Sequence, residues 1–181
     1  MHVPTHILSG WCAANLLPLT PRERVFCMVV AAAADIDGLG ILLSEEMYWD
    51  YHHKLGHGIV FGLLLAGTMA AFSTRRLLAF FGYLACFHLH LVLDYFGSGP
   101  GWPIHYFWPF SDAKWGNADA WPLSSWQNTT AAALLLAWTL WIAVGQRRTP
   151  LEVLMPSLDQ KAIAWIDRRR GATRDGAVIA E

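Results

Sequence analysis

Seven ionisable side chains stand in or beside apolar stretches of the sequence, and all are of types that bind metal ions. They are His6, Asp35, Asp37, His53, His57, His90 and Asp94. Ionisable groups inside apolar segments are costly and usually mark a function. Imidazole and carboxylate ligands without thiolate suit zinc or another divalent first-row metal in a catalytic site. The set is too large for one tetrahedral ion, so we expect two or three divalent ions, with zinc favoured.

The spacing within the set favours shared ligation. His53 and His57 are four residues apart, and so are His90 and Asp94. On a helix, each pair would share one face and could bind one ion or two neighbouring ions. His88 lies about 120° around the helix from Asp94, so we expect it to face elsewhere as a hydrogen-bonded core group.

The two remaining carboxylates, Asp35 and Asp37, are two residues apart. Both would point inward only in an extended or turn conformation, and Gly38 supplies the backbone freedom for such a turn. Two carboxylates at a break in a helix could bridge two cations or bind them separately.

The composition indicates that these residues belong to a membrane protein. The 181-residue chain is 55% hydrophobic and 15% charged, contains 10 Trp and has a mean hydropathy of +0.32. Average soluble domains carry roughly 25% charged residues. A net charge of −1 gives no reason to expect nucleic acid as a partner, whereas membrane lipids are expected partners.

Five apolar segments predict the helices that position the set. They cover residues 7–17, 25–43, 55–74, 77–93 and 120–146. The last three approach the roughly 20 residues that cross a hydrocarbon core of about 30 Å. The second is interrupted at Asp35, where irregular backbone must face a polar cavity or the protein interior. We therefore expect an all-α, polytopic bundle of about five membrane segments, some short or broken, as a hydrolase domain over residues 1–148.

The distribution of basic residues predicts which side of the membrane each end of the bundle faces. On a five-segment path, 11 of the 13 cations fall on one side, and only Lys54 and Lys114 fall on the other. Because basic loops stay cytoplasmic, the seven candidate ligands should all face the extracytoplasmic side of an inner or plasma membrane. Four separate elements thus converge on one side, which favours a single site.

Residues 149–181 form the second predicted part of the chain. Leu158, Ala162, Trp165 and Ile166 stand at roughly helical spacing and predict a short amphipathic helix over residues 158–170, at the cytoplasmic surface. Gly171 to Glu181 is expected to be a mobile tail.

The segments that carry the candidate ligands also resemble a known family. They read THILSG from Thr5, ADID from Ala34, HKLGH from His53, HLVLD from His90 and WPF from Trp108. In this order they resemble an uncharacterised family of membrane-bound, metal-dependent hydrolases, distantly related to zinc-dependent phospholipase C and the zinc single-strand nucleases. The resemblance covers roughly residues 1–112 and implies a multinuclear metal site made by the seven residues named above.

The sequence departs from that family at four positions. Gly56 and Gly58 flank His57, where the family commonly has hydroxyl residues. Lys54 stands where the family commonly has Arg, so the charge is kept but the bidentate fork that suits phosphate is lost. Ala34 replaces the usual Pro before the Asp pair. These departures bear on the substrate more than on metal binding.

These observations predict an integral membrane hydrolase in which a metal-activated water attacks an ester, with a phosphoester favoured. The substrate would be a small molecule or a lipid. Lys54 is the candidate catalytic residue, because its charge could stabilise negative charge in the transition state, although it could equally pair with lipid headgroups.

Two other classes stay open. A non-catalytic membrane metal-binding or transport protein would need ligands along a path through the membrane. A b-type haem protein could use His88 or His90 with His53 or His57, but it leaves the Asp residues unexplained. The sequence does not determine the oligomeric state.

Aromatic residues crowd the expected outward loop over residues 97–128. This loop contains Trp102, Trp108, Trp115, Trp121 and Trp126. An interfacial aromatic belt is favoured for most of them, and a lid or platform beside the metals is the functional alternative.

Overall fold

The computed structural model describes the backbone of residues 1–178 and the side chains of residues 1–170. Its described part contains helices and no strand, which confirms the all-α prediction. The elements are α1 (Val3–Ala14), α2 (Pro21–Ala33), the 3-10 helix η1 (Ala34–Leu42), α3 (Glu45–Tyr51), α4 (Ile59–Ala71), α5 (Arg76–Gly97), α6 (Trp126–Gln146) and α7 (Pro156–Val178).

Three stretches of the described chain are long and apolar enough to cross a membrane. They are Pro21–Leu42, which combines α2 and η1, together with α5 and α6. Helices α1 and α4 have 12 and 13 residues. At 1.5 Å per residue they rise only about 18 to 20 Å, short of a hydrocarbon core of about 30 Å. Each of the five predicted segments contains a helix, but only three stretches of the described residues reach spanning length.

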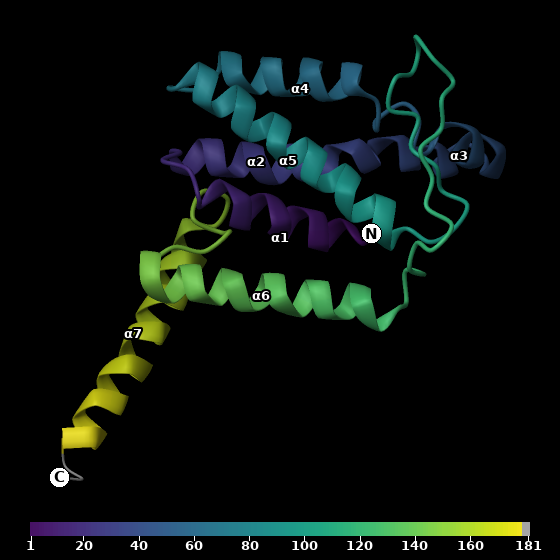
Figure 1. Ribbon diagram of the computed structural model, residues 1–181. Coiled ribbons are helices and arrows are strands. Elements are labelled where there is room, and N and C mark those ends of the chain that lie inside the picture. Colours follow the sequence, from purple (N-terminus) through teal and green to yellow (C-terminus); the bar gives the residue numbers. More distant parts are fainter. Residues whose placement is uncertain (179–181) are drawn as a thin grey trace.

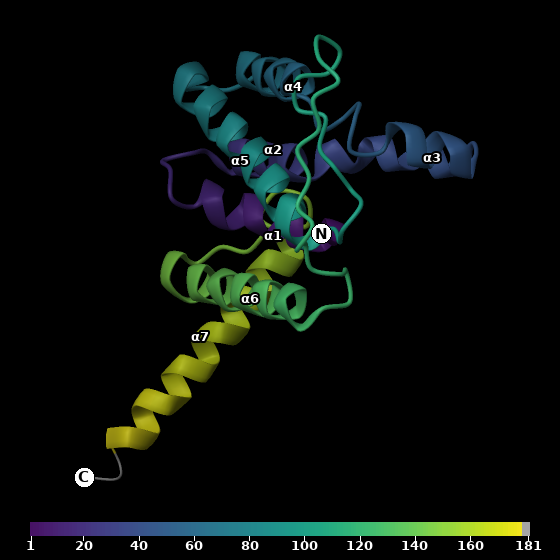
Figure 2. The same cartoon turned by 45° about the vertical axis from the view of Figure 1, so that its right-hand side comes forward.

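Helices α1, α2, α4, α5 and α6 lie side by side (Figures 1 and 2). The connections α1–α2, α4–α5 and α6–α7 gather at one end of this bundle. The N-terminus, α3 and the long loop between α5 and α6 gather at the opposite end. Helix α5 packs against α1, α2 and α4, so its side chains reach the interior from several directions.

Small residues allow the helices to approach closely. A Cβ atom on Gly10 of α1 would lie 2.6 Å from the carbonyl oxygen of Cys27 on α2. A Cβ atom on Gly62 of α4 would lie 2.5 Å from the Phe87 ring on α5. The core between the helices is closed by buried residues such as Tyr83 and Phe87.

The end that carries the short connections is fixed by two buried charged residues. Glu23 forms a capping box with Thr20 at the start of α2 and also accepts a hydrogen bond from the backbone of Thr74, between α4 and α5. Arg24 donates to both carboxylate oxygens of Glu152, at 2.6 and 2.8 Å. These contacts tie α2 to the two other connections at this end.

Helix α4 begins at Ile59, so residues 52–58 form a loop and His53 has a φ of +65°. The interpretation that His53 and His57 share a helix face is therefore wrong. The loop instead approaches η1 so closely that a Cβ atom on Gly56 would lie 2.0 Å from the carbonyl oxygen of Ala34.

The break in the second segment also differs from expectation. Asp35 and Asp37 lie in η1, a 3-10 helix, rather than in an extended strand or a turn. With 3.0 residues per turn, side chains two residues apart on such a helix point about 120° apart. The two carboxylates consequently face different neighbours.

The predicted amphipathic helix at residues 158–170 lies within α7, which projects away from the bundle (Figures 1 and 2). Leu158 and Trp165 are exposed on this helix, with 45% and 54% of their surface accessible. The backbone is helical through Val178, where a tail was expected from Gly171 onward. Residues 179–181 of that tail lie outside the described residues.

Candidate metal centre

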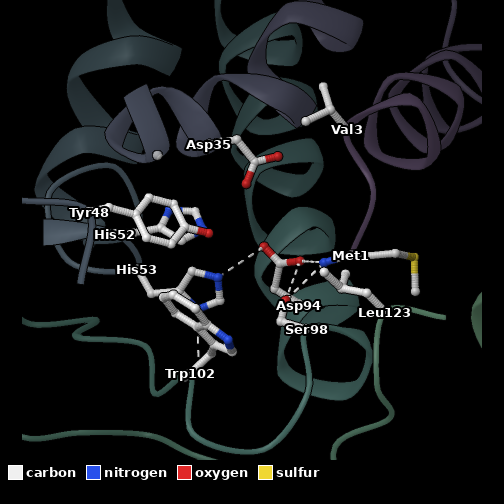
Figure 3. A pocket seen from close by; sticks show the side chains of 11 residues that line it. Met1, Val3, Asp35, Tyr48, His52, His53, Asp94, Ser98, Trp102 and Leu123 are labelled. Carbon is white, nitrogen blue, oxygen red and sulfur yellow. Dashed lines mark hydrogen bonds and ion pairs between the residues drawn. The ribbon is translucent and has the colours of Figure 1, made fainter. Parts of the chain in front are cut away.

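Six of the seven candidate ligands meet at the end of the bundle that carries α3. They form two groups, and within each group the candidate ligand atoms all lie within 4.8 Å of one another. The first group is His6, Asp35, His90 and Asp94, and the second is His53, His57 and Asp94. Asp94 belongs to both groups. Figure 3 shows Asp94 at the centre, with Asp35 above it and His53 beside it.

The spacing of His90 and Asp94 on α5 brings these two side chains together, as expected from the sequence. His90 Nε2 lies 2.9 Å from Asp94 Oδ2, and His57 Nε2 lies 3.3 Å from the same oxygen. The other oxygen, Oδ1, lies 3.1 Å from His6 Nε2. Asp94 is almost fully buried, so this carboxylate is surrounded by protein groups rather than by solvent.

The Nδ1 atoms of two ligand histidines are occupied by backbone carbonyls. His90 Nδ1 donates to the carbonyl of Ala31 at 2.8 Å, and His53 Nδ1 donates to that of Trp102 at 3.2 Å. Because a carbonyl only accepts, the proton is on Nδ1 and the Nε2 lone pair is directed toward the centre. Metal-ligating histidines almost always have such a partner on the second ring nitrogen.

Asp37 lies behind His57 and is absent from both ligand groups of the described residues. Its Oδ2 accepts hydrogen bonds from His57 Nδ1 at 3.0 Å and from the backbone of Gly56 at 2.9 Å. Its Oδ1 accepts from His52 Nδ1 at 2.7 Å. Asp37 thus has the position of a carboxylate that orients a ligand histidine, whereas Asp35 faces the cavity.

The two loop histidines have opposite electrostatic environments. Burial lowers the pKa of His57, but hydrogen bonds to Asp37 and Asp94 outweigh it and raise the pKa to about 9. Burial lowers the pKa of His53 to about 2, and the charge of His57 acts in the same direction. The surroundings thus favour the protonated form of His57 and the neutral form of His53.

The donor set fits a divalent ion by two tests. Zinc–nitrogen and zinc–oxygen distances near 2.0 Å place the ligand atoms of a tetrahedral ion about 3.3 Å apart. Separations within the first group include 2.9 Å between His90 Nε2 and Asp94 Oδ2 and 4.0 Å between His6 Nε2 and Asp35 Oδ2, and all ligand atoms of a group lie within 4.8 Å of one another. In addition, Asp35 Oδ2 is buried and has no hydrogen-bond partner among the described residues. A bound cation would satisfy that oxygen.

A cavity of about 250 Å³ opens beside the centre, and several of its walls were not foreseen from the sequence. The α-amino group of Met1 contacts Asp94, and Ser98 donates to Asp94 Oδ1 at 2.8 Å. Ser98 follows Asp94 by one helical turn, so its spacing could have revealed it. His52 stands outside the spacing pattern, and only its position beside His53 pointed to it.

Trp102 is the aromatic residue of the long loop that reaches the site. It lines the cavity and stacks on Trp49 with ring centroids 4.6 Å apart. Trp115 stacks instead on Tyr106, with centroids 5.4 Å apart. Trp102 thus lies where the functional alternative to an interfacial belt expects it, and its role as a lid or platform stays a prediction.

Two other sequence candidates lie away from the centre. His88 donates from Nδ1 to the carbonyl of Leu84 at 2.7 Å, and its Nε2 lies 2.8 Å from the Tyr106 hydroxyl, so it faces elsewhere as predicted. Lys54 is half-buried in the loop that carries His53 and is not one of the residues lining the cavity. Its catalytic role stays a prediction.

The sequence was also compared with known proteins. The profile of the family described as YdjM inner membrane protein matches residues 1–166. Searches of curated proteins and of solved structures gave no match. The matched region contains all seven candidate ligands and α1 to α6 in full. The chain therefore belongs to the YdjM inner membrane protein family.

Proposed function

We propose that this protein is an inner-membrane, divalent-metal-dependent hydrolase that acts on an ester, with a phosphoester favoured. The observation that carries the proposal is the arrangement of histidines around Asp94. Three of them have Nδ1 bound to an acceptor and Nε2 directed toward the centre. Such orientation is typical of metal ligands and is not needed for packing alone.

The two ligand groups favour two ions over three. One ion would be held by His6, Asp35, His90 and Asp94, and the other by His53, His57 and Asp94. The second group supplies three protein ligands, which leaves a coordination position open in a tetrahedral site. Histidine and carboxylate ligands without cysteine favour zinc, as in the catalytic zinc sites of hydrolases.

A bound divalent ion would lower the pKa of a water ligand and offset negative charge on a phosphoester. The protein's own residues supply the positioning. Asp37 holds the His57 ring, and Asp94 joins the two groups. Trp102 and Tyr48 form walls of the cavity that would receive the substrate. We propose that Lys54, beside His53 in sequence, stabilises negative charge on the substrate.

We also propose that the site faces the extracytoplasmic side and that the C-terminus is cytoplasmic. The three short connections lie at one end of the bundle, and the ligand-bearing elements lie at the other (Figure 1). These connections and the first turns of the helices that follow them contain Arg22, Arg24, Arg75, Arg76, Arg147 and Arg148. Basic connections are retained in the cytoplasm. The short helices α1 and α4 would then enter the membrane without covering its full thickness, as two of five segments.

Transport of a metal ion is the alternative that this arrangement disfavours. Transport needs ligands along a path through the membrane. Both ligand groups found among the described residues share Asp94 and so lie at one end of α5. Zinc uptake into proteoliposomes without hydrolysis of any ester would favour transport over the proposal.

The proposal is tested by measuring metal content and hydrolysis together. Purified wild type, Asp35→Ala and the control His88→Ala are equilibrated with zinc, freed of excess metal and analysed for bound zinc. The same samples are then assayed on soluble phosphodiesters and on phospholipids. We expect zinc and hydrolysis in the wild type and the control, whereas Asp35→Ala should bind less zinc per chain, because only the first ligand group contains Asp35, and should lose hydrolysis. Wild-type protein that binds zinc but hydrolyses no ester would contradict the enzymatic part.

A further inference from the structure

A second hollow on the molecule is almost entirely apolar. This groove has a volume of about 620 Å³ and lies along α1 and α2. Its walls include Val3 and Ile7 of α1 and those residues between Val25 and Ala33 of α2 that point toward the groove. Asp35 is the one ionisable residue among its lining side chains, all of which are described.

The groove meets the cavity of the metal centre. Val3 and Asp35 line both hollows, so the apolar groove and the polar cavity share a wall at the candidate ligand Asp35. Figure 3 shows these two residues at the same edge of the cavity, above Asp94. A molecule with one end at the metal centre could therefore extend into the groove.

The groove has the dimensions and exposure of a site for one lipid chain. From Asp35 back to Val25 it follows ten residues of helix, about 15 Å at 1.5 Å per residue. That length is half of a hydrocarbon core of about 30 Å, the depth of one leaflet. Val29 and Ile36 are 44% and 57% exposed, so a chain could enter sideways from the membrane.

From this continuity we infer that the substrate is a lipid phosphoester, with its anionic headgroup at the metal centre and a hydrocarbon chain in the groove. The inference rests on the proposed function and specifies its substrate class. A headgroup anion complements the positive charge of bound divalent ions. A peptide is a poor occupant, because the apolar walls would leave its backbone polar groups unpaired.

The reaction is a hydrolysis and needs no further reactant. The water oxygen forms a bond to phosphorus, and the bond between phosphorus and the leaving oxygen breaks. One proton of that water ends on the leaving oxygen, which departs as an alcohol. The second proton stays on the phosphate product or is released to solvent.

The chain offers a matched control. A smaller apolar groove of about 260 Å³ lies beside α5 and is lined by residues that include Val92. It shares no lining residue with the cavity of the metal centre. Val29 and Val92 are both exposed valines on helices of spanning length, at 44% and 52%. Val29→Trp would fill the groove along α2, and Val92→Trp would fill the unconnected one.

The test measures binding of dodecyl phosphate and ethyl phosphate to zinc-equilibrated, detergent-solubilised protein by native mass spectrometry, which also counts bound zinc. We expect wild type and Val92→Trp to retain one dodecyl phosphate and to bind ethyl phosphate far more weakly. Val29→Trp should keep its zinc but bind dodecyl phosphate at least about tenfold more weakly, because buried methylenes lose their site. Equal binding by the two Trp variants, or binding that is independent of chain length, would overturn the inference.

The same samples separate this inference from the proposed function. Groove-dependent binding of dodecyl phosphate without hydrolysis of bis-p-nitrophenyl phosphate or phospholipid would support the lipid site and contradict the hydrolase. Hydrolysis of bis-p-nitrophenyl phosphate with binding that Val29→Trp leaves unchanged would support the hydrolase and contradict the lipid site.

Discussion

Asp37 accepts a hydrogen bond from His57 Nδ1 at 3.0 Å and so directs the other nitrogen of that ring toward Asp94. This relationship assigns different tasks to two carboxylates that are only two residues apart in sequence. On the proposed function, Asp37 would orient a ligand, whereas Asp35 stands among the candidate ligand atoms beside His6 and His90. The difference can be measured, because an orienting group and a ligand affect metal binding in different ways.

Substitution of Asp37 should weaken zinc binding without abolishing it. We expect Asp37→Asn to lower zinc affinity about 10- to 100-fold, the usual effect of removing an outer-shell partner, while saturating zinc still fills both sites. Asp35→Ala should instead lower the amount of zinc bound at saturation. Competition against a chromophoric chelator gives both quantities. Equal behaviour of the two variants would contradict the assignment.

The two histidines of α5 near its end provide a matched pair. His90→Gln should remove a ligand from the first group and lower the zinc bound per chain. His88→Gln should retain the wild-type amount, because His88 contacts Leu84 and Tyr106 rather than the centre. Elemental analysis of both variants after removal of free zinc checks this prediction. A loss of zinc in His88→Gln alone would show that the wrong face of α5 has been assigned.

Gly56 should be irreplaceable for steric reasons. In Gly56→Ala the new Cβ atom would lie 2.0 Å from the carbonyl oxygen of Ala34, so the loop must move away from η1. We expect a destabilisation of about 1–3 kcal/mol, the range for overpacked sites, and weaker zinc binding.

Gly67→Ala is the control, because its Cβ atom would have nothing within 4 Å and the residue lies inside α4. Alanine is favoured over glycine in a helix by about 0.5–1 kcal/mol, so this variant should be as stable as the wild type or more stable. Thermal unfolding followed by circular dichroism compares the two. A Gly56→Ala protein with wild-type stability and zinc content would contradict the close packing of loop and η1.

Lys54 tests the electrostatic part of the mechanism. If its charge stabilises the substrate anion, Lys54→Ala should lower kcat/KM for a soluble phosphodiester by roughly tenfold or more, and zinc content should be unchanged. Lys54→Arg should restore most of the loss, because the charge is retained. Steady-state kinetics on the zinc-loaded proteins measure kcat/KM for each variant. A wild-type kcat/KM in Lys54→Ala would exclude a role of Lys54 in stabilising the substrate anion.

The sequence was sufficient to predict the helical class and the convergence of the candidate ligands. Apolar segments and their basic connections placed His6, Asp35, His57 and His90 at one end of a bundle, where the structure also has them. The four-residue spacing of His90 and Asp94 was informative because both residues lie on one continuous helix. Periodicity arguments hold only where the backbone is regular.

The predictions from the sequence were wrong where tertiary contacts determine the backbone conformation. His53 and His57 meet in a loop, with ring centroids 4.3 Å apart, because hydrogen bonds from the loop to Asp37 and close packing against η1 shape it. No local pattern reports such contacts. The division of tasks between Asp35 and Asp37 follows from the 3-10 geometry of η1, which the expected turn did not include.

The most direct test of the central claim is the number of zinc ions bound per chain in purified protein, compared with a His57→Ala/Asp94→Ala variant. The two ligand groups predict about two ions in the wild type and near-complete loss in the double variant, since Asp94 belongs to both groups. A folded wild-type protein that binds no more divalent metal than this variant would contradict the account.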